Sequence, residues 1–281
     1  MLSTTVTPLL MAVLPGALAF TLGYGAFAYP APSASNQERP LTVDLRPKFH
    51  KWNLESRLQG SRGTCSVFAV GGALEYAVAS NRRSGTRLSI EFLNWAGHRA
   101  ANRTEDGGFF SELWKGYETF GVCTENDLPY QSQYDAGLQP PASAVEDAKG
   151  LRDLPLRMHW IKEWDPNTGL TQEQLDAIKH TLGKHWPVCG GFRWPKQAHW
   201  EQDVLHMCPP DQVFDGHSVL LIGYKDDAVQ PGGGIFLIRN SGGDGHDGYL
   251  PYAYVCAYMN DALWIESTRH GKPERKKLRK G

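Results

Sequence analysis

The segment QGSRGTCSVFAVGGALEYA, residues 59–77, is the sequence feature that most constrains the fold. From Thr64 onward, apolar residues recur three and four positions apart, which is the spacing of one face of a helix. The opposite face is also nearly apolar, because Glu75 is the only charged residue before Arg82. A helix that is apolar on all sides is a buried helix. We therefore expect a central helix that begins after Thr64, a residue type common at helix N-caps.

Helical patterns dominate the first half of the chain, and strand patterns dominate the second half. Further helices are predicted at residues 89–98, at residues 110–120 and after Thr171. Residues 138–150 are expected to connect two lobes. Runs rich in β-forming residues, separated by Gly, Pro and Asp, then predict strands at 186–194, 217–224, 234–241 and 252–259. The expected fold class is α+β, with one domain at residues 41–266 that holds a helical lobe (about 60–140) and an antiparallel β-rich lobe (about 151–266).

The two ends of the chain differ in composition from the rest. The first 37 residues carry no charged side chain, and an apolar stretch at residues 9–28 precedes small residues suited to cleavage. This pattern predicts an export signal with its linker at residues 1–35, for a secreted or periplasmic protein. Because the apolar stretch is long enough to span a bilayer, an uncleaved membrane anchor is the alternative. Residues 269–281 form a basic tail, but the net charge of −1 indicates no nucleic-acid partner.

Cys65 is expected at the first turn of the central helix. The partial positive charge at a helix N-terminus stabilises a thiolate, which favours Cys65 as a nucleophile. The alternative is that Cys65 is a small buried residue. Further along the chain, two apolar strands flank a polar turn, and we expect Tyr224 opposite Gly233. That register would set His217 opposite Asn240, within hydrogen-bond reach. A thiol, an imidazole and an orienting amide are the parts of nucleophilic catalysis, although a histidine and an asparagine at a strand edge also occur in structural roles.

Several segments together resemble the papain-like cysteine peptidases. QGSRGTCSVFA resembles the active-site segment of that family, DGHSVLLIGY its histidine strand and FLIRNSGG its asparagine strand. LSIEFLNW and DGGFFSELWKGYETFGVCTENDLPY resemble the helices and the glycine-containing loop of its helical lobe. The Cys–His–Asn order agrees, as does the interval between Cys65 and His217. The resemblance covers about residues 43–254 and implies a papain-like two-lobe fold with the active-site cleft between the lobes.

The resemblance also implies a role for each matching residue. Cys65 would be the nucleophile, His217 its base and later its acid, Asn240 the residue that orients His217, and Gln59 a donor to the oxyanion together with the Cys65 backbone N–H. The substrate-binding positions would be Gly107, Gly108 and Gly216. The implied reaction is hydrolysis of a peptide or protein substrate through a thioester acyl-enzyme, without a cofactor. We expect no metal site, since the chain has neither Cys-x-x-Cys nor His-Glu-x-x-His.

The chain also departs from the family pattern. Arg62 stands where the family has a cysteine three residues before the nucleophile, so that disulfide is absent. Gly242 and His246 stand where the family has tryptophans, the first of which shields the Asn–His hydrogen bond from water. An aromatic residue such as Trp194 or Trp200 could supply that cover instead. The alternatives to a peptidase are therefore a papain-fold protein with lost or weak hydrolysis that binds peptides or a partner, and an acyl transferase that uses an amine as acceptor.

Two further expectations concern processing and cysteines. The sequence leaves no room for a long helical propeptide between the signal and residue 43. The odd number of cysteines predicts one free thiol in an exported protein. Two pairs drawn from Cys123, Cys189, Cys208 and Cys256 would leave Cys65 as that thiol.

Overall fold

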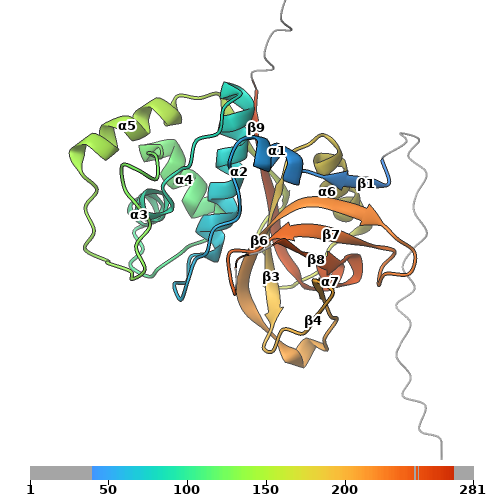
Figure 1. Ribbon diagram of the computed structural model, residues 1–281. Coiled ribbons are helices and arrows are strands. Elements are labelled where there is room, and N and C mark those ends of the chain that lie inside the picture. The colour runs from blue at the N-terminus through green and yellow to red at the C-terminus, as the bar shows by residue number, and fades with distance from the viewer. Residues whose placement is uncertain (1–39, 244, 246, 269–281) are drawn as a thin grey trace, which may run out of the picture. The chain divides into compact units, whose positions relative to one another are not determined.

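The structure, a computed structural model, describes residues 40–243, 245 and 247–268 (Figure 1). The expected signal or anchor and the basic tail lie outside these residues. Within the described part, no helix combines the length and the apolar character needed to cross a membrane. The helices are α1 (Arg46–Lys51), α2 (Cys65–Arg82), α3 (Ile90–Ala101), α4 (Phe110–Phe120), α5 (Ala142–Arg152), α6 (Gln172–Gly183) and α7 (Tyr252–Tyr258). The strands are β1 (Thr42–Asp44), β2 (Leu156–Lys162), β3 (Val188–Pro195), β4 (Trp200–Glu201), β5 (Val204–Leu205), β6 (Val213–Asp226), β7 (Gly234–Arg239), β8 (Asp247–Pro251) and β9 (Met259–Ser267).

The central helix α2 is buried along most of its length, as the sequence predicts. It contacts α3 and α4 on one side and strands β6 and β9 on the other. Two glycines allow this close packing. A Cβ atom at Gly71 would lie 2.5 Å from Ile90 Cδ1, and one at Gly72 would lie 3.0 Å from Leu220 Cδ2. The helix that begins at Cys65 therefore rests directly on strand β6.

The helical lobe follows the cap signals in the sequence. Helices α3 and α4 confirm the predictions for residues 89–98 and 110–120. The Ser89 hydroxyl accepts a hydrogen bond from the Phe92 backbone N–H and caps α3. Helix α4 ends at Gly121, whose φ of 79° suits a glycine.

The segment at residues 138–150, expected to connect the lobes, is mostly helix, which the sequence did not predict. Helix α5 occupies most of this segment and contacts α4. Its buried residues are Ala144, Ala148 and Leu151, which are spaced four and three positions apart on one helical face. Small alanine side chains give only a weak hydrophobic pattern in the sequence, and packing against α4 stabilises the helix.

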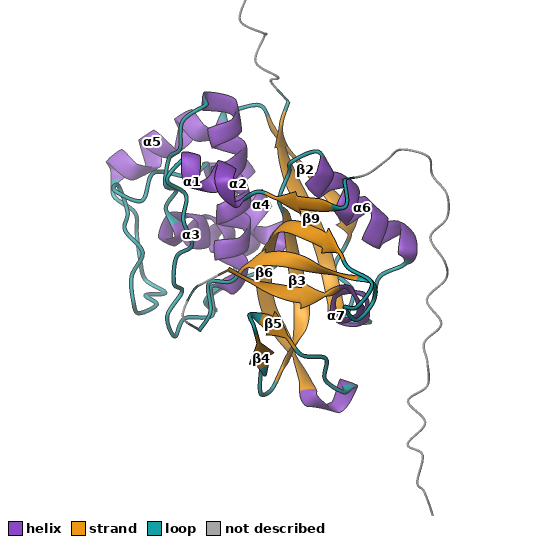
Figure 2. Ribbon diagram, turned by 45° about the vertical axis from the view of Figure 1, so that its right-hand side comes forward, coloured by secondary structure: helices purple, strands orange, loops and turns teal. Residues whose placement is uncertain are grey.

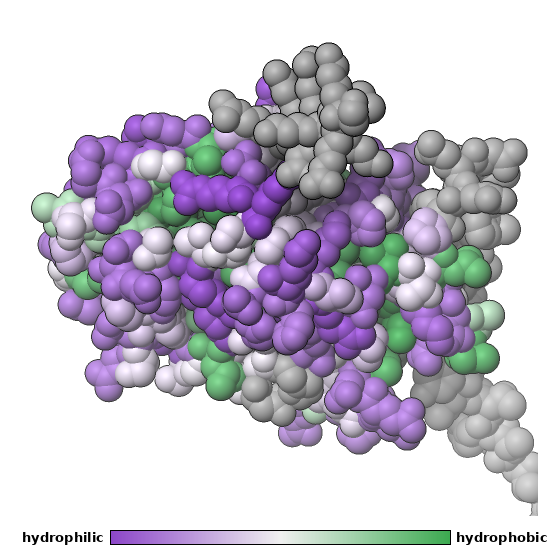
Figure 3. Space-filling model, turned by 45° about the horizontal axis from the view of Figure 1, so that its top comes forward, coloured by the Kyte–Doolittle hydropathy of each residue, from purple (hydrophilic) through white to green (hydrophobic). Residues whose placement is uncertain are grey.

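The β-rich lobe is one nine-stranded sheet with the order β2-β9-β3-β6-β7-β8-β5-β4, in which β1 also pairs with β6. Its strand pairs are antiparallel except for β5 with β8. Figure 2 shows α2 to α5 gathered on one side of the strands. The α+β class and the two-lobe architecture are confirmed. Figure 3 shows that the face in view is mainly hydrophilic, with hydrophobic side chains in small separate patches.

The strand predicted at residues 252–259 is wrong. This run forms helix α7, and β9 begins only at Met259. Tyr254 and Tyr258, four residues apart, are both buried on the same side of α7, with ring centroids 5.0 Å apart. Tyrosines that alternate with small residues predict a strand. In α7, however, the spacing of four residues places the two tyrosine rings on one buried face.

The predicted register of the β6–β7 hairpin is also wrong. Tyr224 lies opposite Phe236, not opposite Gly233. The ladder continues to Asp226 opposite Gly234, beyond the expected last pair, and a bulge shifts the register between Leu221 and Gly223. His217 and Asn240 are therefore not opposite each other on the paired strands, and their contact is described below.

Candidate active site

Cys65 is the first residue of α2 and lies in a cavity of about 360 Å³. Its side chain is largely buried, since the residue is only 9% exposed. The Cys65 Sγ lies 3.8 Å from the Gly216 carbonyl oxygen, directly before His217 on β6. Both Cys65 and His217 line this cavity. The packing of α2 on β6 thus brings the predicted nucleophile and the predicted base to one place.

The His217 Nε2 lies 2.8 Å from Asn240 Oδ1. The same Oδ1 accepts a hydrogen bond of 3.0 Å from the Gly242 backbone N–H. An oxygen held by that N–H can only accept, so the proton of the His217–Asn240 bond belongs to His217 Nε2. In the neutral ring, Nδ1 is then unprotonated and free to accept a proton. The pairing that the sequence predicts is present, although Asn240 follows the end of β7 instead of lying opposite His217.

Burial shifts the pKa values of both groups. It raises the pKa of the Cys65 thiol, and hydrogen bonds from Ser218 and from Ser66 only partly oppose this. Burial also lowers the pKa of the His217 imidazole, against the opposing effect of its bond to Asn240. Both shifts favour the neutral thiol and the neutral imidazole. The helix N-terminus, expected to favour a thiolate, is therefore outweighed by desolvation.

Gln59, the predicted oxyanion donor, is held at both ends of its side-chain amide. Its Nε2 donates to the Arg62 carbonyl at 2.8 Å, and its Oε1 accepts from Ser241 Oγ at 2.8 Å. The Gln59 backbone N–H also donates to the Ser241 carbonyl at 2.9 Å. Since Ser241 follows Asn240, these bonds tie Gln59 to the segment that orients His217. An amide nitrogen has two N–H groups, and one is used among the described residues.

The predicted substrate-binding glycines occupy different positions. Gly108 and Gly216 line the cavity. Gly107 is buried behind it, with its N–H donating to Asn94 Oδ1 at 3.1 Å. A Cβ at Gly107 would lie 2.1 Å from the Gly63 carbonyl oxygen, and its φ is 81°. Gly107 therefore joins two loops by close backbone packing, while its neighbour Gly108 reaches the cavity.

The residues of the cavity lining that were not predicted from the sequence include Phe109, Trp164, Asn260 and Asp261. Phe109 precedes α4 in the helical lobe, and Trp164 follows β2 in the β-rich lobe. Their rings meet across the lining with centroids 5.3 Å apart, although the two residues are 42% and 49% exposed. Exposed aromatic residues near the cleft were visible in the sequence, but nothing in it indicated that these two would meet.

Asp261 gives the cavity a buried carboxyl group. The residue is only 4% exposed and lies opposite Gly191 in the β3–β9 ladder. A Cβ at Gly191 would lie 2.1 Å from Asp261 Oδ1, so the carboxyl occupies the space that a side chain there would fill. Burial raises the pKa of Asp261 to about 7, with partial opposition from the Gly191 N–H and the Lys162 charge.

Trp194, at the end of β3, supplies aromatic cover for the imidazole. Its ring lies 4.6 Å from the His217 ring, centroid to centroid, at an angle of 62°. Gly242 leaves open the neighbouring side, since a Cβ there would lie 3.2 Å from His217 Cε1 and 3.4 Å from Asn240 Oδ1. An aromatic residue from the segment before His217 thus packs on the pair, and the contact that it makes is with the His217 ring.

We expect Trp194→Ala to lower kcat roughly two- to tenfold. Water would then compete for the His217–Asn240 bond, and a hydrogen bond contributes about 0.5–1.5 kcal/mol net. Steady-state hydrolysis of a fluorogenic peptide measures the change, and Gly242→Trp in the Trp194→Ala background should recover part of the rate. Trp200→Ala is the matched control, because Trp200 packs against Trp194 with ring centroids 6.2 Å apart. An equal loss in Trp200→Ala, or an unchanged Trp194→Ala, would contradict the covering role.

All five cysteines are free thiols in the structure. The two expected disulfide pairs are therefore not formed. Cys65 differs from the others in lining the cavity. Burial raises the pKa of Cys123 to about 12 and that of Cys256 to about 11.

Comparison with known proteins gives a consistent picture. No family model matches the chain. The sequence is similar to cathepsin S of Rattus norvegicus, with 24% identity over 229 residues (79% of this chain and 62% of the relative). It is also similar to pro-cathepsin H of Bos taurus, with 25% identity over 215 residues (75% and 59%). The chain thus spans about three fifths of the length of these two relatives. Among solved structures, xylellain, a cysteine protease from Xylella fastidiosa, superposes with a TM-score of 0.63 at 21% identity (82% of this chain and 87% of that one).

Proposed function

We propose that this chain, which belongs with the papain-like cysteine peptidases in fold and in sequence, hydrolyses peptide bonds through a thioester acyl-enzyme. One observation carries the proposal: Cys65 begins a helix at the same cavity as His217, whose Nε2 is bonded to Asn240 at 2.8 Å. A nucleophile, a base and an orienting group in this relation are typical of covalent catalysis. Export to the periplasm or the exterior, and a peptide or protein substrate, belong to the same proposal.

The geometry supports the following sequence of steps. His217 Nδ1 takes the thiol proton while Cys65 Sγ bonds to the substrate carbonyl carbon. The carbonyl oxygen becomes an oxyanion, which the Cys65 backbone N–H and the Gln59 amide would stabilise. The C–N bond then breaks, and His217 gives its proton to the leaving amine. Water attacks the resulting thioester with His217 as base, releasing the acid and the Cys65 thiol.

A papain-fold protein with lost or weak hydrolysis is the second candidate. It is favoured by Gly242, which has no side chain to shield the His217–Asn240 bond from water on that side. A peptidyl epoxide directed at thiols distinguishes the two candidates. A peptidase is expected to hydrolyse fluorogenic peptides and to be alkylated once, at Cys65. Peptide binding without turnover and without alkylation would favour the binding protein.

We further propose that the cavity accepts a cationic substrate side chain at Asp261. The Asp261→Asn variant is then expected to lose at least about tenfold in kcat/KM for peptides with Arg or Lys entering the cavity, and little for peptides with Leu there. Because the pKa of Asp261 is about 7, its charge is present above that pH and lost below it. The preference for Arg over Leu should therefore increase as the pH rises through about 7.

A peptide library assayed at pH 6 and pH 8 measures this preference. Asp165→Asn is the matched control, because Asp165 lies next to Trp164 but does not line the cavity. Lys162, the cation whose charge acts on Asp261, donates hydrogen bonds to backbone carbonyls, those of Gly169 at 2.8 Å and Met259 at 2.9 Å. If Asp261→Asn and wild type prefer Arg over Leu to the same extent, another group recognises the substrate side chain.

A further inference from the structure

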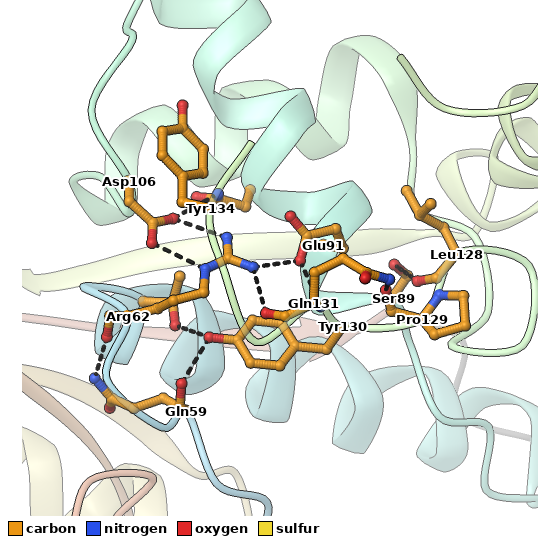
Figure 4. A network of polar contacts seen from close by, with 12 residues as sticks. Gln59, Arg62, Ser89, Glu91, Asp106, Leu128, Pro129, Tyr130, Gln131 and Tyr134 are labelled. Carbon is orange, nitrogen blue, oxygen red and sulfur yellow. Dashed lines mark hydrogen bonds and ion pairs between the residues drawn. The ribbon is translucent and has the colours of Figure 1, made fainter. Parts of the chain in front are cut away.

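The Arg62 side chain is buried beside the candidate active site, between helix α3 and the loops that hold Asp106 and Gln131 (Figure 4). Its guanidinium is 3% exposed. Nε and Nη2 donate to the two carboxylate oxygens of Asp106, each at 2.9 Å, and Nη1 donates to Glu91 Oε2 and to the Gln131 carbonyl. Four of its five N–H groups are thus used. A planar guanidinium is the one side chain that can satisfy acceptors in this fork-shaped arrangement.

The backbone of Arg62 supports Gln59. The Arg62 carbonyl accepts the 2.8 Å hydrogen bond from Gln59 Nε2, the proposed oxyanion donor. The Tyr130 hydroxyl reinforces the same turn by donating to the Gln59 carbonyl at 2.8 Å, and the Tyr130 ring lies 4.7 Å from the guanidinium carbon of Arg62. Tyr130 also contacts the Thr64 hydroxyl at 2.7 Å, directly before Cys65. The turn that holds Gln59 and Cys65 therefore depends on contacts with Arg62 and Tyr130.

The Asp106 end of the network supports the opposite wall of the cavity. Asp106 directly precedes Gly107 and Gly108, and its Oδ1 also accepts from Asn94 Nδ2 at 2.9 Å. Asn94 in turn accepts the Gly107 N–H. One guanidinium thus connects the loop that holds Gln59 with the loop that presents Gly108.

The charges explain why these loops stay together. Arg62 is the cation between two carboxylates, Glu91 and Asp106, and Glu91 is buried. Without the cation, two carboxylates would face each other with little access to water, which is strongly unfavourable. The loops would then move apart, or water would enter between them.

We propose that Arg62 is a positioning residue for the proposed hydrolysis, which fixes the Gln59 amide and the Gly107–Gly108 wall relative to Cys65. This proposal rests on the proposed function. In this proposal, one buried network of ion pairs, the tether, holds together the loops on the two sides of Cys65. No cysteine takes part in this network, so reductants that protect the Cys65 thiol leave the tether intact.

The test compares Arg62→Lys with wild type in peptide hydrolysis, in affinity for an aldehyde and in alkylation of Cys65. Lysine keeps the charge but cannot bind Asp106, Glu91 and Gln131 together. We expect kcat to fall about 10- to 100-fold, with KM changed less than about threefold, because a small displacement of an oxyanion donor affects the transition state most. The affinity for acetyl-leucyl-leucyl-argininal, an aldehyde whose hemithioacetal adduct with Cys65 places its oxygen where the oxyanion would form, should fall by a similar factor. Alkylation of Cys65 by iodoacetamide forms no oxyanion and should stay within about threefold.

Controls separate this role from a loss of stability and from a failure of the proposed function. Arg87→Lys disturbs another arginine that pairs with a buried carboxylate, Glu75, and should leave kcat unchanged in the folded protein. Asp106→Asn, which keeps the Glu91 and Gln131 bonds, should lower kcat about three- to tenfold and serves if Arg62→Lys does not fold. Unchanged kcat and aldehyde affinity in either folded variant would overturn the proposal, as would an equal loss in Arg87→Lys. A wild type that binds the aldehyde without hydrolysing peptides would refute the hydrolysis, and the aldehyde affinities of the variants would still test the tether.

Discussion

Replacing Cys65 with alanine is expected to lower peptide hydrolysis by about 10⁴-fold or more, because removal of a nucleophile removes the covalent route itself. The remaining groups at the cavity could orient the substrate, but no sulfur would be present to bond to its carbonyl carbon. Values of kcat/KM for a panel of fluorogenic peptides measure the effect, with the folded state checked by circular dichroism. The same variant should show no alkylation by a peptidyl epoxide.

Cys256→Ala is the matched control for this variant. Cys256 is a half-buried thiol in α7 that does not line the cavity, and burial raises its pKa to about 11. Its replacement should leave kcat/KM within about twofold. Residual activity above about a tenth of wild type in Cys65→Ala would exclude Cys65 as the nucleophile. Alkylation of Cys256 before Cys65 in the native protein would do the same.

The Gln59→Ala variant should lose about 10²–10³ in kcat, the usual effect of removing one oxyanion donor. Its KM should change little, because the oxyanion exists only after the sulfur has attacked. Since Gln59 also binds Ser241, the alanine variant disturbs the segment next to Asn240 as well. Gln59→Glu separates the two roles, because it keeps an oxygen that accepts from Ser241 and loses the N–H donor.

Both Gln59 variants should be measured beside Gln131→Ala. The Gln131 side chain donates to the Pro129 carbonyl and is exposed, and only its backbone carbonyl contacts Arg62. We expect Gln131→Ala to keep its kcat. If Gln59→Glu retains more than a third of the wild-type kcat, the oxyanion donor must be sought elsewhere along the cavity.

The helices that were predicted correctly have their signals in the nearby sequence. Helix α3 carries a serine N-cap, Ser89, and helix α4 ends at a glycine, Gly121, and both have a periodic apolar face, so each can be located from the nearby sequence. Helix α5 and helix α7 lack such signals, since alanines or alternating tyrosines define them, and they form because neighbouring elements bury them.

The candidate site shows the same division. Cys65, His217 and Asn240 could be predicted because each sits in a segment with a recognisable pattern. The register that was used to pair the last two was wrong, because a bulge beside Gly223 and the point where the turn begins cannot be read from apolar alternation. Their hydrogen bond is present because the Gly242 N–H fixes the Asn240 oxygen.

Arg62, Asp261 and Trp194 acquire their importance from contacts far along the chain. Asp106 is 44 residues from Arg62, and the strand that carries Asp261 follows β3 by more than 60 residues. A single arginine or aspartate in the sequence is by default a solvated surface residue. Only the three-dimensional arrangement shows that these two are buried, and what each of them faces.

The contact between Phe109 and Trp164 has a consequence for which proteins could be digested. The two rings join the lobes beside the cavity, with centroids 5.3 Å apart. An α-helix with its side chains is about 10–12 Å wide, and a hairpin needs two strands about 4.8 Å apart, so neither fits easily into a cavity of about 360 Å³. A single extended strand is the shape that can enter. A folded protein would then be cut mainly where it has frayed or locally opened, and the rate of its destruction would follow how often it opens as much as which residues it displays.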